Sequence, residues 1–274
     1  MFSLKFLKKR PPLTYYGGKQ QLSKRIVPLI PQHLIYDEPF FGGGAIFFAK
    51  DPSRVEFIND TNGEVINFYQ VLKKDFKALK SEIDCTLHSE FQHKQAIEIY
   101  RNPIGKTPLK RAWAVWVLSH QSIYAILCNS WKLSKLRNAA HSVTNKKEEF
   151  AQAYQARLEN TSIFCRDALD VIAKTDTPDT FHYVDPPYYN SDGGHYKGYT
   201  REDFEKLLKL LSGIKGKFML SSYPSDLIDQ YIHQNGWRTI EIEMQRSAGG
   251  GRKTEVITIN YEPPLTEAEV AQAA

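Results

Sequence analysis

The stretch Leu34-Ile35-Tyr36-Asp37-Glu38-Pro39-Phe40-Phe41-Gly42-Gly43-Gly44-Ala45 decides the fold. Its apolar start predicts a short strand, its glycines predict a turn, and Ile46-Phe47-Phe48-Ala49 predicts the helix that follows. A second strand is predicted at 55–58, ending at Asn59-Asp60, and a long amphipathic helix is predicted at 65–83. This alternation of strands and helices predicts an α/β sheet with mainly parallel strands.

The same pattern extends over most of the chain. A helix is predicted at 19–30, where apolar residues share a face and Pro31 follows. Thr200 and Asp203 form a capping box that predicts the start of another helix. Further strands are predicted at residues 163–165, 181–184, 218–221, 240–243 and 256–259. The last two flank a loop with glycine and arginine, and they predict a closing antiparallel hairpin.

Between residues 84 and 160 the strand pattern stops. The sequence there is helical or irregular and rich in basic and aromatic residues, which predicts a domain inserted into the α/β domain. We therefore expect one domain formed by residues 1–67 and 161–264, a mostly helical inserted domain at 68–160, and a short tail at 265–274.

Composition narrows the class of protein. The chain has 274 residues, of which 42% are hydrophobic and 24% charged, as in ordinary soluble globular proteins. It contains no run of ~18 to 20 apolar residues that could span a membrane, and its first basic residues follow apolar ones, unlike a secretory signal. The 3 cysteines lack metal-type spacing, so neither disulfides nor a metal site is expected. We expect a cytoplasmic protein whose net charge of +5 permits a polyanionic partner without requiring one.

Asp185-Pro186-Pro187-Tyr188 is the most informative motif for chemistry. It follows an apolar strand, at the edge of an α/β sheet where ligands bind. The two prolines lack backbone N–H groups, so the carbonyls beside them can face a ligand. Asp185 adds a second acceptor and Tyr188 adds a flat surface, a combination that suits an amino group on a planar ring. The alternative is a rigid turn with an incidental aspartate.

The glycines at 42–44 let a ligand approach the backbone closely. They do not form the dinucleotide fingerprint, because that spacing would need glycine where Phe47 stands. Asp60 follows Gly42 by 60 − 42 = 18 residues, near the spacing of an acid that binds a ribose. The pair indicates an adenosine-containing ligand without pyrophosphate, with a packing turn and a helix cap as the alternatives.

Four motifs in this order resemble the Dam-type, or D12-class, DNA adenine methyltransferases, and their phage-like branch in particular. They are Tyr16-Gly17-Gly18-Lys19, the stretch 38–45, Asn59-Asp60 and Asp185-Pro186-Pro187-Tyr188. The resemblance covers most of the chain outside the insert. It implies a Rossmann-like methyltransferase sheet, an inserted target-recognition domain, and an enzyme of DNA adenine methylation such as those of restriction–modification systems.

The resemblance also implies that S-adenosylmethionine is the methyl donor. Its binding residues would come from the N-terminal motif, the glycine-rich stretch and the ends of later strands, with Asp167 as the contact to its adenine. The implied set is Tyr15, Tyr16, Gly17, Gly18, Lys19, Glu38, Phe40, Gly42, Gly44, Asp60, Asp167 and Asp185.

The catalytic residues implied are Asp185, Pro186, Pro187 and Tyr188. The exocyclic nitrogen of adenine is a poor nucleophile because its lone pair is delocalised. Hydrogen bonds from its two protons to Asp185 and to the Pro186 carbonyl would localise that lone pair, and the nitrogen would then attack the sulfonium methyl group in line. A duplex hides this nitrogen, so the base must flip out, and Tyr188 would receive it by stacking.

Double-stranded DNA is the expected partner, bound by Tyr124, Trp131 and Lys132 of the insert and by Arg246, Arg252 and Lys253 of the hairpin loop. The alternative for the hairpin loop is a simple solvated loop. Trp113 and Trp116 lie in an apolar helical run and are predicted to be core residues. We expect a monomer, and a dimer stays open.

Two other functions are compatible with parts of this pattern. Methyltransferases of the same fold act on amino groups of cytosine, RNA or protein glutamine, and their motif begins with aspartate or asparagine. The aspartate at 185, the N-terminal motif and the insert favour DNA adenine instead. A non-catalytic DNA-binding relative would require a damaged motif, whereas all four motifs are intact.

Overall fold

The structure, a computed structural model, describes residues 10–189, 198–245 and 252–264. It divides into two compact units, each built from several segments of the chain. The first unit comprises Met1–Ser23, Gly42–Pro52 and Asp60–Cys165, and the second comprises Lys24–Phe41, Ser53–Asn59 and Arg166–Ala274. The domain boundaries expected from the sequence stay a prediction.

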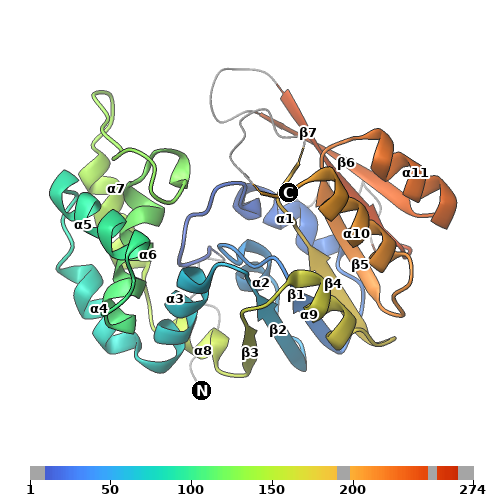
Figure 1. The fold of residues 1–274 in the computed structure, drawn as a ribbon, viewed down its shortest axis with the longest axis horizontal. Helices are drawn as coiled ribbons and strands as arrows, with labels where there is room; N and C mark the ends of the chain where they lie inside the picture. The colour runs from blue at the N-terminus through green and yellow to red at the C-terminus, as the bar shows by residue number, and fades with distance from the viewer. Residues whose placement is uncertain (1–9, 190–197, 246–251, 265–274) are drawn as a thin grey trace. The chain divides into compact units, whose positions relative to one another are not determined.

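The second unit is built on a sheet whose strands run in the order β2-β1-β4-β5-β7-β6 (Figure 1). Strands β2, β1, β4 and β5 are parallel, and β7 pairs antiparallel with both β5 and β6. The predicted sheet of mainly parallel strands, closed by an antiparallel hairpin, is therefore confirmed. The strands span β1 (Ile35–Glu38), β2 (Val55–Asn59), β4 (Thr180–Val184), β5 (Lys217–Ser222), β6 (Arg238–Gln245) and β7 (Arg252–Ile259).

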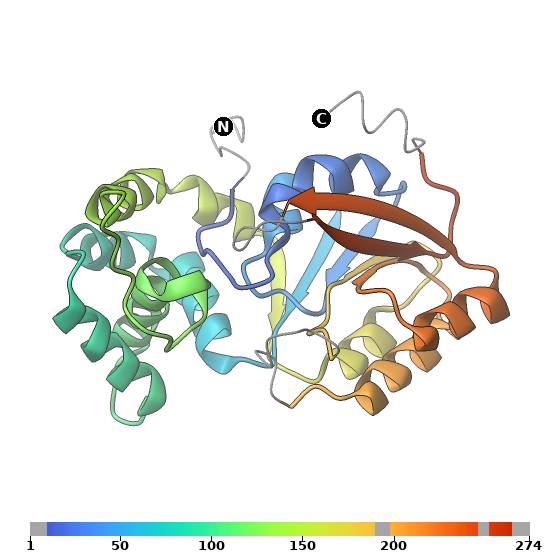
Figure 2. The same cartoon turned by 90° about the horizontal axis from the view of Figure 1, so that it is seen from above.

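Three helices cover one face of this sheet (Figure 2). They are α9 (Ala168–Thr175), α10 (Arg201–Leu211) and α11 (Asp226–Asn235). The capping box of Thr200 and Asp203 at the start of α10 is confirmed, with both of its hydrogen bonds present. The helices and the sheet share a buried apolar core that includes Ile172, Val184, Phe204, Leu207, Leu208, Phe218, Leu220 and Ile228.

The opposite face of the same sheet carries buried polar side chains. Successive side chains of a strand alternate between faces, and the register pairs Tyr36 with Phe181 and Ser221 with Ile257. The alternation places Tyr36, Glu38, Tyr183, Ser221 and Glu255 on this second face, and all of them are buried. This face thus combines buried polar side chains with buried apolar ones such as Phe181 and Ile257.

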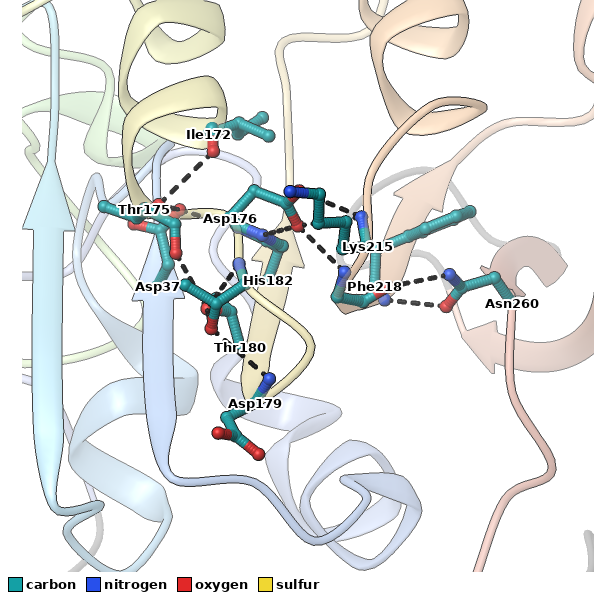
Figure 3. A network of polar contacts seen from close by, with 12 residues as sticks. Asp37, Ile172, Thr175, Asp176, Asp179, Thr180, His182, Lys215, Phe218 and Asn260 are labelled. Atoms are coloured by element: carbon teal, nitrogen blue, oxygen red, sulfur yellow. Dashed lines mark hydrogen bonds and ion pairs between the residues drawn. The ribbon is translucent and has the colours of Figure 1, made fainter.

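A buried histidine ties β4 to its neighbours (Figure 3). The His182 side chain has no exposed surface, and its Nδ1 lies 2.8 Å from Oδ2 of Asp37 on β1. The Thr175 hydroxyl of α9 donates to the same oxygen at 3.0 Å. Asp176 Oδ1 lies 3.6 Å from His182 Nε2 and accepts hydrogen bonds from the backbone that leads into β5. One polar network therefore joins β1, β4, α9 and the start of β5.

The first unit contains the helices of the predicted insert. Helix α6 packs against α3 and α5, and Trp113 and Trp116 of α6 are buried, which confirms their prediction as core residues. Among the described residues, no helix is both long and apolar enough to cross a membrane. The elements are α3 (Gly63–Lys74), α4 (Phe76–Asp84), α5 (Glu90–Arg101), α6 (Pro108–Gln121), α7 (Ala139–Glu149), α8 (Ala153–Leu158) and β3 (Thr161–Phe164).

Two predicted helices were wrong in their extent. The helix predicted at 65–83 is two helices, α3 and α4, because Asp75 leaves the helical conformation and its side chain caps α4. The helix predicted at 19–30 is a series of short turns around α1 (Ser23–Ile26), because Pro28 has no N–H to continue the helical hydrogen bonds.

Candidate active site

The carboxyl edge of the sheet in the second unit holds the predicted catalytic motif. In the sheet, β2 lies on one side of β1, and β4 and β5 lie on the other side. The carboxyl ends of β1 and β4 therefore flank the point where the strand order reverses, which is where α/β sheets bind ligands. Glu38 is the last residue of β1, Phe40 follows it by two positions, and Asp185 comes directly after β4. Three predicted site residues thus share one edge.

Tyr188 is held by its hydroxyl group. Its Oη lies 3.2 Å from Oδ1 of Asp185 and 2.9 Å from Oγ of Ser221, and it also hydrogen-bonds Glu255. The side chain is only 9% exposed. Burial, together with the nearby carboxylates of Asp185 and Glu255, raises the pKa of Tyr188 well above its ordinary value. The hydroxyl therefore keeps its proton at neutral pH and acts as a donor.

Aromatic side chains surround the ring of Tyr188. The Tyr223 ring meets it edge to face, with 4.5 Å between ring centroids. A small pocket beside the ring is lined by Pro187, Tyr188, Tyr189, Phe204, Ser222 and Tyr223. The lining is largely aromatic, and the hydroxyl groups of its serine and tyrosines are its side-chain polar atoms.

The glycine-rich turn lies in the first unit, against the N-terminal segment. A Cβ atom on Gly42 would lie 3.0 Å from the Tyr15 ring, and one on Gly43 would lie 3.1 Å from Tyr15 Cβ. Gly42 also has φ +46°, a conformation that side chains disfavour. Glycine is therefore required here, because the backbone of the turn and Tyr15 approach each other closely. Gly44 has φ +67° and starts helix α2 (Ala45–Ala49).

Asp60 binds two backbone N–H groups of the first unit. Its Oδ2 accepts from the Gly42 N–H at 2.8 Å, and its Oδ1 accepts from the Asn62 N–H at 2.8 Å. Burial raises its pKa, although these two hydrogen bonds oppose that effect. The cap of helix α3 is Asn62 rather than Asp60, so the helix-cap alternative for Asp60 does not describe this structure. Asp60 holds the glycine-rich turn in place.

The remaining predicted cofactor residues have local partners. The Lys19 amine is buried and donates to the Gly17 carbonyl at 3.1 Å, and Tyr16 lies half-buried in the same turn. The Gly18 N–H closes this turn on the Tyr15 carbonyl.

In the second unit, Glu38 accepts from the Tyr36 hydroxyl at 2.6 Å. Asp167 is exposed and caps helix α9 through the Leu169 N–H. Among the described residues, no group of three acidic, histidine or cysteine side chains is arranged to hold a metal ion.

The predicted DNA-binding residues of the insert lie in one loop of the first unit. A bridge between Ser122 and Trp131 closes the loop, and Trp131 stacks on His88 with ring centroids 4.6 Å apart. Tyr124 is 64% exposed and adopts φ +59°. A positive φ at a residue with a side chain costs of order 1 kcal/mol and is common at functional loops. Lys132, next to the bridge, is exposed.

The predicted basic contacts of the hairpin loop lie outside the described side chains. Arg246 lies outside the described residues, and so do the side chains of Arg252 and Lys253, whose backbone belongs to β7.

Sequence reasoning missed Ser221, Glu255 and Tyr223. A signal for Glu255 was present, because it alternates with Ile257 and Ile259 on β7 and so falls on their buried face. Its pairing with Tyr188 depends on a contact between residues 67 positions apart, which no local pattern reveals.

Comparisons with known proteins agree with the motifs. Residues 15–247 match the family described as D12 class N6 adenine-specific DNA methyltransferase. The Type II methyltransferase M1.LlaDCHI of Lactococcus lactis subsp. cremoris is 27% identical over 92% of this chain and 95% of its own length. The DNA adenine methylase of Escherichia coli (strain K12) is 23% identical over 93% and 96%. The DNA N-6-adenine-methyltransferase of Escherichia phage P1 is 24% identical over 84% of this chain and 32% of its own length.

Proposed function

Because the chain belongs to the D12 class of N6 adenine-specific DNA methyltransferases, we propose that it methylates the exocyclic amino group of a specific adenine in duplex DNA, with S-adenosylmethionine as the methyl donor. The observation that carries the proposal is the position of Asp185-Pro186-Pro187-Tyr188. The motif stands where the strand order reverses, beside an aromatic pocket. Since the chain acts on DNA, we place it in the cytoplasm of a bacterium or a phage-infected cell.

The motif supplies what the reaction needs from the protein. Asp185 and the Pro186 carbonyl accept the two amino protons of the target adenine, which concentrates the nitrogen lone pair toward the methyl donor. Pro187 keeps the turn rigid. The ring of Tyr188 stacks on the base once it has left the duplex, and such stacking is worth about 1 to 3 kcal/mol per base. S-adenosylmethionine supplies the electrophilic methyl group when bound.

The residues of the glycine-rich turn fit an adenosine-containing donor. Each carboxylate oxygen of Asp60 accepts one backbone hydrogen bond and keeps a second lone pair for a ribose hydroxyl. Gly42 and Gly44 carry no side chain that would block a close approach to the backbone. We propose that the donor is bound by Tyr15, Tyr16, Gly17, Gly18, Lys19, Glu38, Phe40, Gly42, Gly44, Asp60, Asp167 and Asp185.

Replacing Asp60 by alanine should weaken S-adenosylmethionine binding by about 1 to 3 kcal/mol, because a charge-assisted hydrogen bond to the donor and the anchor of Gly42 are both lost. Asp60→Asn keeps the shape and removes the charge, so we expect a smaller loss. Titration calorimetry without DNA measures both variants. Unchanged affinity in Asp60→Ala would assign Asp60 a purely structural role.

For DNA, we propose contacts from Tyr124, Trp131 and Lys132 and from Arg246, Arg252 and Lys253. If the last three bind phosphates, replacing them together by alanine should weaken binding to many sequences alike and reduce the salt slope by roughly 2 to 3. Preference among sequences should persist, because phosphate contacts position a protein without reading bases. Binding to matched and scrambled duplexes across a salt series measures this, and an unchanged slope would show that the loop is only solvated.

The function itself is tested by sequencing modified bases in the DNA of cells that express the chain. We expect N6-methyladenine within one short sequence, absent from cells that express Asp185→Ala. Methylated cytosine instead would favour the alternative of a cytosine amino methyltransferase. Unmodified DNA would favour an RNA or protein substrate, or a non-catalytic DNA-binding relative.

A further inference from the structure

The hydroxyl group of Tyr188 faces more acceptors than it has protons. It lies 3.2 Å from Oδ1 of Asp185 and also hydrogen-bonds Oε1 of Glu255. A phenol carries a single proton, and the raised pKa of Tyr188 keeps that proton in place. Asp185 and Glu255 therefore compete for one hydrogen bond.

Ser221 contacts both Glu255 and Tyr188. Its hydroxyl donates to Oε1 of Glu255 at 2.6 Å and lies 2.9 Å from the Tyr188 hydroxyl. Ser221 and Glu255 lie on the neighbouring strands β5 and β7, and both side chains are buried, with 1% of Glu255 exposed. The hydroxyl groups of Tyr188 and Ser221 thus both hydrogen-bond Glu255. The contact from Tyr188 to Asp185 is longer than its contact to Glu255.

The direction of the Tyr188 proton matters for the reaction. When the proton points to Asp185, it occupies a lone pair of the carboxylate that has to accept the adenine amino group. When it points to Glu255, the proton occupies neither oxygen of Asp185. Asp185 is only partly buried, so it remains accessible to a substrate, while Glu255 is enclosed.

We propose that Glu255 is a positioning residue that holds the Tyr188 hydroxyl proton away from Asp185, so that this proton does not occupy the carboxylate oxygen that accepts the amino group of the target adenine. The proposal rests on the proposed function. The same hydrogen bond, together with the edge contact of Tyr223, fixes the plane of the Tyr188 ring.

Glu255→Gln separates this role from a general contribution to packing. Glutamine has the same shape, but its NH₂ group can donate to the Tyr188 oxygen and turn the tyrosine proton toward Asp185. We expect the kcat for adenine methylation to fall about 10-fold, as for weakened preorganisation at a reacting group, and the KM for S-adenosylmethionine to change little. Glu241→Gln, the same change at an exposed position of β6, is the matched control and should retain full activity.

A double-mutant cycle with Tyr188→Phe is decisive. Phenylalanine keeps the ring and removes the proton for which Asp185 and Glu255 compete. In the Tyr188→Phe background, Glu255→Gln should therefore have no further effect on kcat. A merely structural Glu255 predicts that the two losses multiply.

The outcomes are distinguishable. A Glu255→Gln enzyme with normal kcat, or a loss that persists in the Tyr188→Phe background, would overturn the proposal. Thermal unfolding of each variant checks that it is folded, and Glu255→Asp, which withdraws the carboxylate by one methylene, tests the same cycle if Glu255→Gln does not fold. A wild-type protein that methylates no adenine would instead refute the proposed function.

Discussion

Replacing Asp185 by alanine is expected to lower the rate of methyl transfer at least about 100-fold, because a preorganised acceptor at the reacting nitrogen is removed. The carboxylate is only partly buried and lies at the carboxyl end of β4. Its loss leaves the sheet intact. Single-turnover transfer of labelled methyl groups to duplex DNA measures the rate.

Asp229→Ala is the matched control for this variant. Asp229 is an exposed acid on α11, away from the motif in sequence, and its replacement should leave the rate unchanged. Asp185→Ala should still bind duplex DNA with much of the normal affinity and unfold at a similar temperature. If it kept more than a tenth of the wild-type rate, Asp185 would not be the acceptor described above.

The second large effect concerns stability. Asp37→Ala should lower the free energy of unfolding by about 3 to 5 kcal/mol, the usual cost of removing one partner from a buried polar or ionic pair. Asp37 Oδ2 receives both His182 Nδ1 and the Thr175 hydroxyl, and all three side chains are buried. Without Asp37, the buried Nδ1 of His182 loses its partner, whereas the Thr175 hydroxyl keeps the Val171 carbonyl at 2.9 Å. Denaturant unfolding with a constant m-value measures the change.

Asp179→Ala is the control for Asp37→Ala. Asp179 lies in the turn before β4 and is exposed, and its backbone carbonyl accepts a hydrogen bond from the Ile35 N–H of β1, which alanine retains. A surface change of this kind should alter stability by less than about 0.5 kcal/mol. Equal losses in both variants would contradict the assignment of stability to the His182 network.

Local patterns predicted where the strands lie, but not all of their ends. β4 and β5 match the predicted apolar runs to within one residue at each end, whereas β6 and β7 begin two and four residues earlier than predicted. The helices were less predictable. Asp75 could continue one helix or cap the next, and the second option prevails because its side chain accepts the Ala78 N–H. Helices α9 and α11 went unpredicted, although Asp167 and Ser225 are cap residues at their starts.

The candidate site also has a part that the sequence predicted and a part that it did not. Asp185, Tyr188 and the glycine-rich turn are contiguous motifs, so their chemistry can be inferred from the sequence. The partners that orient them come from other strands. Ser221 and Glu255 meet Tyr188 only because β5 and β7 pair in an antiparallel register, and such pairing between distant segments leaves no local trace.

The most direct test of the central claim is a methyl-transfer assay with the purified protein. S-adenosylmethionine labelled in its methyl group is incubated with duplex DNA of varied sequence, the DNA is digested to nucleosides, and the labelled nucleoside is identified. We predict that the label appears in N6-methyldeoxyadenosine. The Asp185→Ala variant should incorporate at least about 100-fold less label. Label in methylated cytosine, or DNA that stays unlabelled while the wild-type protein binds the donor, would contradict the account.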